Sequence, residues 1–168
     1  MILGIDPGSV TTGYGIITED EGELRCVAYG VIESPPKTSI AKRLLKIGQG
    51  IQKLFQEHKL KAVVIEKTFL AKNVDSVTKL SYARGVCVYE AARAGIPIFE
   101  YSPTEVKMNV VGHGRAGKDQ VQILVGQLLK ISTAQITKFD MSDALALAIH
   151  HCRVEGTWEK LREREISL

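Results

Sequence analysis

Two short apolar runs, each closed by an acidic residue, constrain the fold of this chain more than any other feature. Met1–Asp6 reads MILGID, and Ala62–Glu66 reads AVVIE. The second run has the composition of a strand buried on both faces of a parallel sheet. An open α/β sheet places its usual binding site in the crevice outside the carboxyl ends of its strands. We therefore expect Asp6 and Glu66 to lie at such a crevice.

The remaining segments predict a mixed sheet. Thr12–Thr18 and Leu24–Ile32 have β-type composition and short connections, which favours an antiparallel meander with the first run. Ile96–Tyr101 is a further expected strand. Helices are expected from apolar spacing, small-residue content and start signals; they cover residues 40–55, 73–94, 118–130 and 140–154, with another beginning at Pro103. This order predicts one α/β domain, residues 1–155, followed by a charged, frayed tail over residues 156–168.

Composition places the chain among ordinary globular domains. Its 168 residues are 45% hydrophobic and 24% charged, and a chain of this length buries a core without disulfides or a structural metal. The three cysteines form no closely spaced pair, so we expect reduced thiols. The sequence shows neither a basic leader region nor a long apolar run. We therefore expect a cytoplasmic protein with no membrane partner.

The charge is unevenly distributed. Residues 1–36 carry a net charge of −5 and residues 37–84 a net charge of +8, although the whole chain carries only +3. Two interpretations of the basic segment stay open: it is a solvated helix face, or it is the footprint of a polyanion such as nucleic acid.

A second pair of acids begins the last expected helix. Asp140 and Asp143 are three residues apart and so share a helix face. Acids are favoured in a helix's first turn by capping and by the macrodipole, so this pair alone indicates little. Together with the strand-ending Asp6 and Glu66, however, it supplies the oxygen ligands that a hard divalent cation needs. Two such cations can stabilise the attacking and leaving oxygens of phosphodiester hydrolysis.

Four longer stretches are characteristic as a set: ILGIDPGSVTTGYGII, VIEKTFLAKNVDSVTKLSYARGV, VVGHGRAGKDQVQ and DMSDALALAIHHC. Together they resemble the RuvC family of bacterial Holliday junction resolvases, within the ribonuclease H-like superfamily. The resemblance implies a ribonuclease H-like fold, with helices on both faces of a mixed five-stranded sheet. It also implies a homodimer that cuts two opposed strands of a four-way DNA junction, leaving 5′-phosphate and 3′-hydroxyl ends. The RuvA and RuvB branch-migration proteins are its implied partners.

The resemblance also assigns roles to individual residues. The family's catalytic, metal-binding carboxylates, which hold two Mg²⁺ ions per subunit with Mn²⁺ as a substitute, map onto Asp6, Glu66, Asp140 and Asp143. A family phenylalanine stacks on bases at the junction centre, and basic residues contact backbone phosphates; the predicted DNA-binding residues are Phe69, Lys72, Lys107, Arg115 and Lys118. By residue type alone, Phe69 would be a core residue and the lysines surface residues.

The expected helix over residues 73–94 is rich in small residues, which would let a partner helix approach closely. We predict that it contributes the dimer interface through Val74, Val77 and Ala83.

Several motifs of the sequence admit other interpretations. Gly112–Lys118 contains part of a phosphate-binding loop, but Asp119 stands where Ser or Thr must hold Mg²⁺, so we interpret it as a flexible DNA-facing loop. The histidines have no complementary metal-ligand spacing, and a structural or solvated role is expected for His113, His150 and His151. An actin-like ATPase would need two such lobes. A YqgF-like nuclease acting on RNA, and a catalytically silent binding module, stay open.

Overall fold

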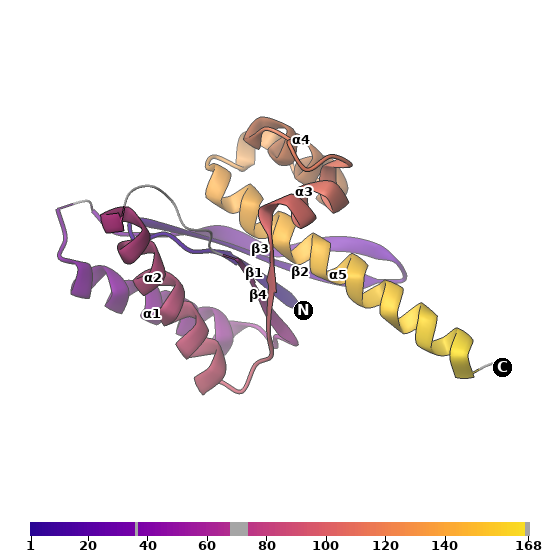
Figure 1. The fold of residues 1–168 in the computed structure, drawn as a ribbon, viewed down its shortest axis with the longest axis horizontal. Helices are drawn as coiled ribbons and strands as arrows, with labels where there is room; N and C mark the ends of the chain where they lie inside the picture. The colour runs from indigo at the N-terminus through magenta and orange to yellow at the C-terminus, as the bar shows by residue number, and fades with distance from the viewer. Residues whose placement is uncertain (36, 68–73, 167–168) are drawn as a thin grey trace.

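The computed structural model describes residues 1–35, 37–67 and 74–166, with side chains described up to residue 156. A single sheet contains five strands in the order β3-β2-β1-β4-β5, and helices lie on both sides of it (Figure 1). The strands are β1 (Ile2–Asp6), β2 (Thr11–Asp20), β3 (Glu23–Glu33), β4 (Ala62–Glu66) and β5 (Ile98–Tyr101). The helices are α1 (Ile40–Glu57), α2 (Val74–Arg93), α3 (Pro103–Val111), α4 (Lys118–Leu129) and α5 (Phe139–Ile166), with a short 3₁₀ turn, η1 (Thr133–Gln135).

The sheet is mixed, as the sequence predicted. β1, β2 and β3 form an antiparallel meander, whereas β4 pairs parallel to β1 and β5 pairs parallel to β4. β2 and β3 are joined at Glu21 and Gly22, both with positive φ, which is the backbone conformation that a tight hairpin connection requires. The parallel strands are joined through helices, as parallel pairing demands.

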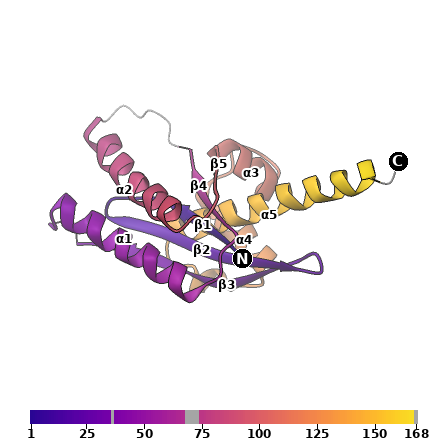
Figure 2. The same ribbon diagram turned by 90° about the horizontal axis from the view of Figure 1, so that it is seen from below.

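Alternating side chains of the central strands bury two separate cores. Leu3 of β1 and Val63 of β4 pack on one face against α1 and α2, which lie side by side (Figure 2). Ile2 and Val64 pack on the other face against α3, α4 and α5. Because successive residues of a strand point to opposite faces, a strand that is apolar at every position belongs in the middle of a three-layer fold.

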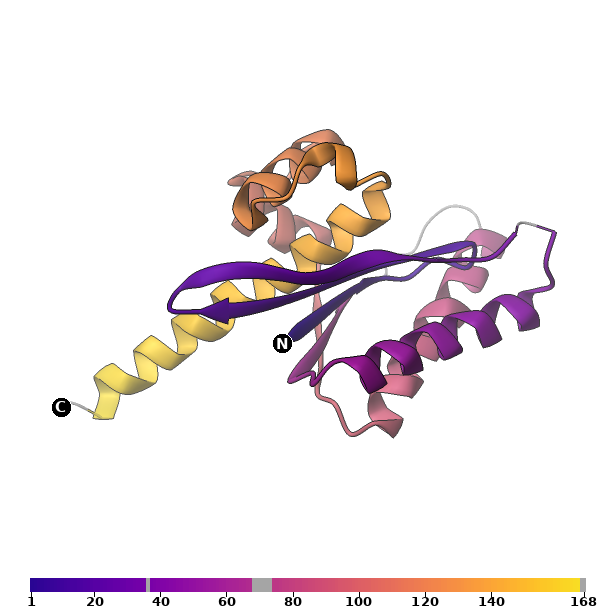
Figure 3. The same cartoon turned by 180° about the vertical axis from the view of Figure 1, so that it is seen from behind.

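The last helix is longer than the sequence suggested. We expected it to end at Val154, but α5 continues to Ile166 and extends past the sheet (Figure 3). The fraying of the tail stays a prediction. Every described helix is too short or too polar to cross a membrane. The three cysteines are free thiols, as expected.

Candidate active site

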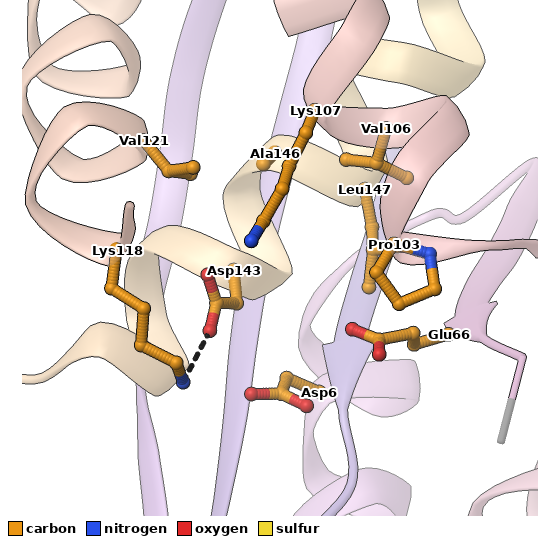
Figure 4. A pocket seen from close by; sticks show the side chains of 10 residues that line it. All are labelled: Asp6, Glu66, Pro103, Val106, Lys107, Lys118, Val121, Asp143, Ala146 and Leu147. Atoms are coloured by element: carbon orange, nitrogen blue, oxygen red, sulfur yellow. Dashed lines mark hydrogen bonds and ion pairs between the residues drawn. The ribbon is translucent and has the colours of Figure 1, made fainter. Parts of the chain in front are cut away.

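Strand polarity brings the first two acids together. β1 and β4 are adjacent and parallel, with Ile5 level with Ile65. The next residue of each strand is therefore an acid at the same carboxyl edge of the sheet. Asp6 and Glu66 both project into one pocket there (Figure 4), as the two strand-ending runs predicted.

The third and fourth acids arrive on α5, which docks unusually close to the sheet. Gly4 of β1 pairs with Gly15 of β2, and Asp6 pairs with Gly13. A Cβ atom on Gly4 would lie 1.9 Å from the Ala144 carbonyl oxygen, and one on Gly13 would lie 2.0 Å from the Asp140 carbonyl oxygen. These glycines therefore let the first turns of α5 contact the backbone of β1 and β2, beside Asp6.

The pocket combines acids, lysines and an apolar floor. Its volume is about 190 Å³, and it is lined by Asp6, Glu66, Pro103, Val106, Lys107, Lys118, Val121, Asp143, Ala146 and Leu147. Asp143 points from α5 toward Asp6 and Glu66 (Figure 4). Asp140, one helical turn earlier, lines a neighbouring hollow with Phe139 and Lys138. The four predicted acids thus occupy one region, with Asp140 at its edge.

Lys118 supplies positive charge inside this region. Its Nζ donates a hydrogen bond to Oδ2 of Asp143 at 3.0 Å. Burial by itself lowers the pKa of Lys118, but the hydrogen bond to Asp143 and the nearby charges of Asp6 and Asp140 outweigh it and raise that pKa. Lys107 reaches into the same pocket from α3 (Figure 4). Lys118 therefore carries its charge at neutral pH and offsets part of the carboxylate repulsion.

The carboxylates perturb one another strongly. Burial, followed by the charges of Asp143, Glu66 and Asp140, raises the pKa of Asp6 from 3.8 to about 8. Burial and the charge of Asp143 also raise the pKa of Glu66, against the opposing effect of Lys118 and Lys107. Crowded acids that resist ionisation indicate a site built for a ligand that brings positive charge.

The donor set fits a hard divalent cation. Within the described residues, no three acidic, histidine or cysteine side chains converge closely enough to enclose one ion by themselves. Mg²⁺ does not require such a cage, because it is commonly held by one or two carboxylates together with water and substrate phosphate oxygens. Asp6 lies centrally, since Asp143, Glu66 and Asp140 all act on its pKa. Asp6 would therefore bind a cation together with one or more of these three carboxylates.

The predicted DNA-binding residues fall into three groups. Lys107 and Lys118 line the pocket. Arg115 is exposed in the connection between α3 and α4. Phe69 and Lys72 lie outside the described residues, so their roles stay predictions.

The connection that carries Arg115 runs between two helices and is bounded by two glycines. Gly112 ends α3 with a φ of 91°, and Gly117 is the N-cap of α4. The segment follows a helix and not a core strand, so it lacks the context of an ATP-binding phosphate loop.

The predicted interface residues need a correction at Ala83. Its side chain is fully buried within the chain, in the core between α2 and the sheet. A small residue packs equally well against its own sheet and against a partner helix, which is why its size misled the prediction. Val74 is 78% exposed, and Val77 is half-buried. The outer face of α2 also exposes Tyr82 and Tyr89.

Two histidines of the last helix are buried away from the pocket. His150 and His151 are only 7% and 3% exposed. His151 Nδ1 is hydrogen-bonded to the Tyr101 hydroxyl at 2.8 Å, and the His150 ring meets the Tyr101 ring edge-on. Burial lowers the pKa of both histidines, so they are neutral packing residues.

The sequence is similar to those of known proteins over nearly its whole length. The chain matches the model of the family described as "Crossover junction endodeoxyribonuclease RuvC" over residues 2–151. The chain belongs to the RuvC family. RuvC of Protochlamydia amoebophila is 45% identical over 92% of this chain and 91% of its own length. RuvC of Bdellovibrio bacteriovorus is 39% identical over 100% of this chain and 98% of its own length.

A solved structure agrees with the fold. The chain of T. thermophilus RuvC in complex with a Holliday junction substrate superposes with a TM-score of 0.83, at 28% identity, covering 90% of this chain and 92% of that one. The expected ribonuclease H-like architecture of the RuvC family is thereby confirmed. Membership of this nuclease family implies a divalent metal, which is the kind of ligand that the crowded carboxylates favour.

Sequence reasoning missed two features of the site. Gly4 lies inside the run MILGID and Gly13 inside TGYG, and glycine inside a strand marks a close backbone approach. Phe139, directly before Asp140, was not singled out, although it is a large apolar residue at the start of a helix beside an acid.

Proposed function

We propose that this chain is a structure-selective DNA endonuclease that resolves four-way (Holliday) junctions by metal-dependent phosphodiester hydrolysis. The observation that carries the proposal is the single pocket in which Asp6, Glu66 and Asp143 meet Lys107 and Lys118. Carboxylates alone would repel a phosphate, whereas a pocket that mixes acids with lysines suits a cation and a phosphodiester together.

The roles of the residues follow from their positions. Asp6, Glu66, Asp140 and Asp143 would hold two Mg²⁺ ions, for which Mn²⁺ can substitute. A bound divalent cation activates water and neutralises the charge that develops on the phosphate. Lys107 and Lys118 would contact the phosphate oxygens flanking the cut. These contacts orient the scissile bond and fix which phosphate of the strand lies at the cations. Cleavage leaves 5′-phosphate and 3′-hydroxyl ends.

The assembly follows from the reaction. Two opposed nicks require two active sites, and a C2 homodimer supplies them. We place the interface on the exposed face of α2, with Val74 at its beginning. We further propose a cytoplasmic protein that works with the RuvA and RuvB branch-migration proteins.

The test is cleavage of a synthetic four-way junction beside linear duplex DNA and an RNA hairpin, in Mg²⁺ and in chelator. We expect paired, symmetric nicks in the junction alone and only with the cation, and mapped ends should religate. Preferential cleavage of the RNA hairpin would instead support a YqgF-like activity. Junction binding without cleavage in either Mg²⁺ or Mn²⁺ would support a silent binding module.

A matched pair of variants ties the activity to this pocket. Asp143→Asn removes a pocket carboxylate, whereas Asp119→Asn removes an exposed acid that follows Lys118 on α4. Cleavage should vanish in the first variant and persist in the second. Equal activities would place the reaction elsewhere on the chain.

A further inference from the structure

An exposed aromatic ring stands beside the catalytic acids without an assigned role. Phe139 is the first residue of α5 and directly precedes Asp140, yet its side chain is 38% exposed. The Lys118 ammonium lies 5.8 Å from the centroid of this ring. This distance is within the range in which a cation is attracted to an aromatic face.

The backbone that carries the Phe139 ring is hydrogen-bonded within the first turn of α5. The Phe139 carbonyl accepts a hydrogen bond from the Ser142 hydroxyl at 2.8 Å, and Ser142 is fully buried. The preceding residue, Lys138, is paired with Glu33 at the end of β3. The Phe139 backbone is therefore tied to its own helix by one hydrogen bond, and the side chain of the residue before it reaches the sheet.

The helix that carries Lys118 is attached to the same segment. Gln122, one turn after Lys118 on the same face of α4, donates from Nε2 to the Ile136 carbonyl at 2.6 Å. Ile136 is only 1% exposed. This hydrogen bond connects α4 to the segment just before Phe139 and so keeps the backbones of Lys118 and Phe139 near each other, although the lysine stem itself has four rotatable bonds.

Two described contacts define where the Lys118 head group rests: the Asp143 carboxylate at 3.0 Å and the Phe139 ring. The first contact competes with the cation, because Asp143 is a proposed metal ligand. The Phe139 ring is not a metal ligand, so it stays available to the Lys118 ammonium when a cation is bound. A lysine in the first turn of a helix also gains nothing from the macrodipole, so Lys118 is not there to stabilise α4.

We propose that Phe139 is a positioning residue for Lys118: its ring keeps the ammonium at the site when Asp143 turns to the cation. The ring acts through the lysine and does not contact the reacting atoms. This role rests on the proposed function, because the lysine's task there is to contact a substrate phosphate. It predicts that the effect of Phe139 vanishes when Lys118 is absent.

The test is a double-mutant cycle with Phe139→Leu, Lys118→Met and the double variant, measured as single-turnover junction cleavage in Mg²⁺. Leucine keeps the apolar bulk but lacks the ring's negative face. Phe139→Leu should slow cleavage by about two- to five-fold, the size of an exposed cation–ring interaction, and Phe139→Tyr should restore the rate. In the Lys118→Met background, Phe139→Leu should have no further effect. Ile123→Ala, which truncates an exposed apolar side chain of α4, is the control.

A spectroscopic measurement separates this inference from the proposed function. The Lys118 Hε resonances should be shifted upfield by the ring, with and without Mg²⁺, and should return to ordinary positions in Phe139→Leu. Lys107, in the same pocket, serves as the internal reference. If the wild-type protein cuts no junction but the shift is present, the proposed function fails while the contact stands.

Two results would overturn the positioning role. One is an equal loss of cleavage from Phe139→Leu in both backgrounds, because the ring would then act on its own, for example by stacking on a base. The other is a Lys118 shift that disappears when Mg²⁺ is added, because the ring would then not hold the lysine in the cation-loaded protein.

Discussion

At the scale of single residues, the acids of the pocket differ in their electrostatic environment and in their position on the fold. Asp6 ends the central strand β1, and the charges of three other carboxylates raise its pKa. Asp140 sits in the first turn of α5, where an acid has a second possible purpose, since it can stabilise the helix end. The catalytic and the helix-stabilising interpretations of Asp140 make opposite predictions.

We predict that Asp140→Asn abolishes junction cleavage while the free energy of unfolding in metal-free buffer holds or rises slightly. The reason is that the substitution removes a cation ligand and also relieves repulsion of Asp6. If Asp140 were only a helix-stabilising acid, cleavage would be unchanged and the free energy of unfolding would fall by about 0.3–1 kcal/mol, because asparagine lacks the charge that favours the helix N-terminus. Urea denaturation and a cleavage assay on one preparation decide between them, with Asp119→Asn in the first turn of α4 as the matched control.

The perturbed Asp6 predicts an unusual dependence of stability on pH. Its pKa is about 8 in the folded chain against 3.8 ordinarily, so between these values the native state binds more protons than the unfolded state. The free energy of unfolding must then fall as pH rises through this window, by at most about 1.4 kcal/mol per pH unit for one group. The contribution of Asp6 to the free energy of unfolding is fully present below its ordinary pKa and fully lost above its pKa in the folded chain.

Urea denaturation in chelator across this pH range measures the effect. Asp6→Asn should flatten the decline, and Mg²⁺ should restore stability at the alkaline end. Asp20→Asn, which removes an exposed carboxylate paired with Arg25, should keep the wild-type slope. A decline that is unchanged by Asp6→Asn would show that another group is responsible.

At the scale of elements, the site depends on how closely α5 docks on β1 and β2. A Cβ atom at Gly4 or Gly13 would overlap the α5 backbone, whereas at Gly48 of α1 it would meet its nearest neighbour, Glu90 Oε1, at an ordinary 3.4 Å. Gly4 and Gly13 therefore allow α5 to lie close to the sheet, whereas Gly48 has no such role.

We predict that Gly4→Ala and Gly13→Ala each destabilise the protein by about 1–3 kcal/mol, because α5 must move away from the sheet. Gly13→Ala should also impair cleavage at temperatures where it is fully folded, since the displaced backbone is that of Asp140. Gly48→Ala should be neutral or stabilising by about 0.5–1 kcal/mol, because a helix interior favours alanine. Thermal unfolding and cleavage rates test this; wild-type cleavage by folded Gly13→Ala protein would contradict it.

At the scale of the whole molecule, the proposed homodimer requires a surface through which two copies of the chain can pack. Along α2, Tyr82 is 51% exposed and Tyr89 is 62% exposed, and a Cβ atom at Gly85 between them would meet nothing. Large exposed aromatic residues beside a glycine suit close packing of two helices about a two-fold axis.

We predict that Tyr82→Glu combined with Tyr89→Glu yields a folded monomer, because both side chains face outward from their own chain. Light scattering should report the monomer mass, and junctions should be nicked on one strand without a paired second cut. Met108→Glu, at an exposed position of α3, should stay dimeric. Retention of the dimer mass by the double variant would place the interface on another surface.

The sequence by itself determined the elements and the identity of the acids. Asp6 and Glu66 could be placed at one edge because an apolar run that ends in an acid defines both a central strand and the position of its last residue. The mixed sheet followed from the spacing of the strands, since short connections force antiparallel pairs and helical ones permit parallel pairs. These are local properties of the chain.

Tertiary structure alone decided how those elements meet. It turned Asp143 into the pocket and Asp140 toward its edge, although periodicity put both acids on one helix face. It buried Ala83 inside its own chain, where its small size had indicated a partner helix. It also paired Lys118 with Asp143 and set Phe139 beside that pair. Each outcome depends on which surfaces pack together and how closely, and residues far apart in sequence determine that jointly.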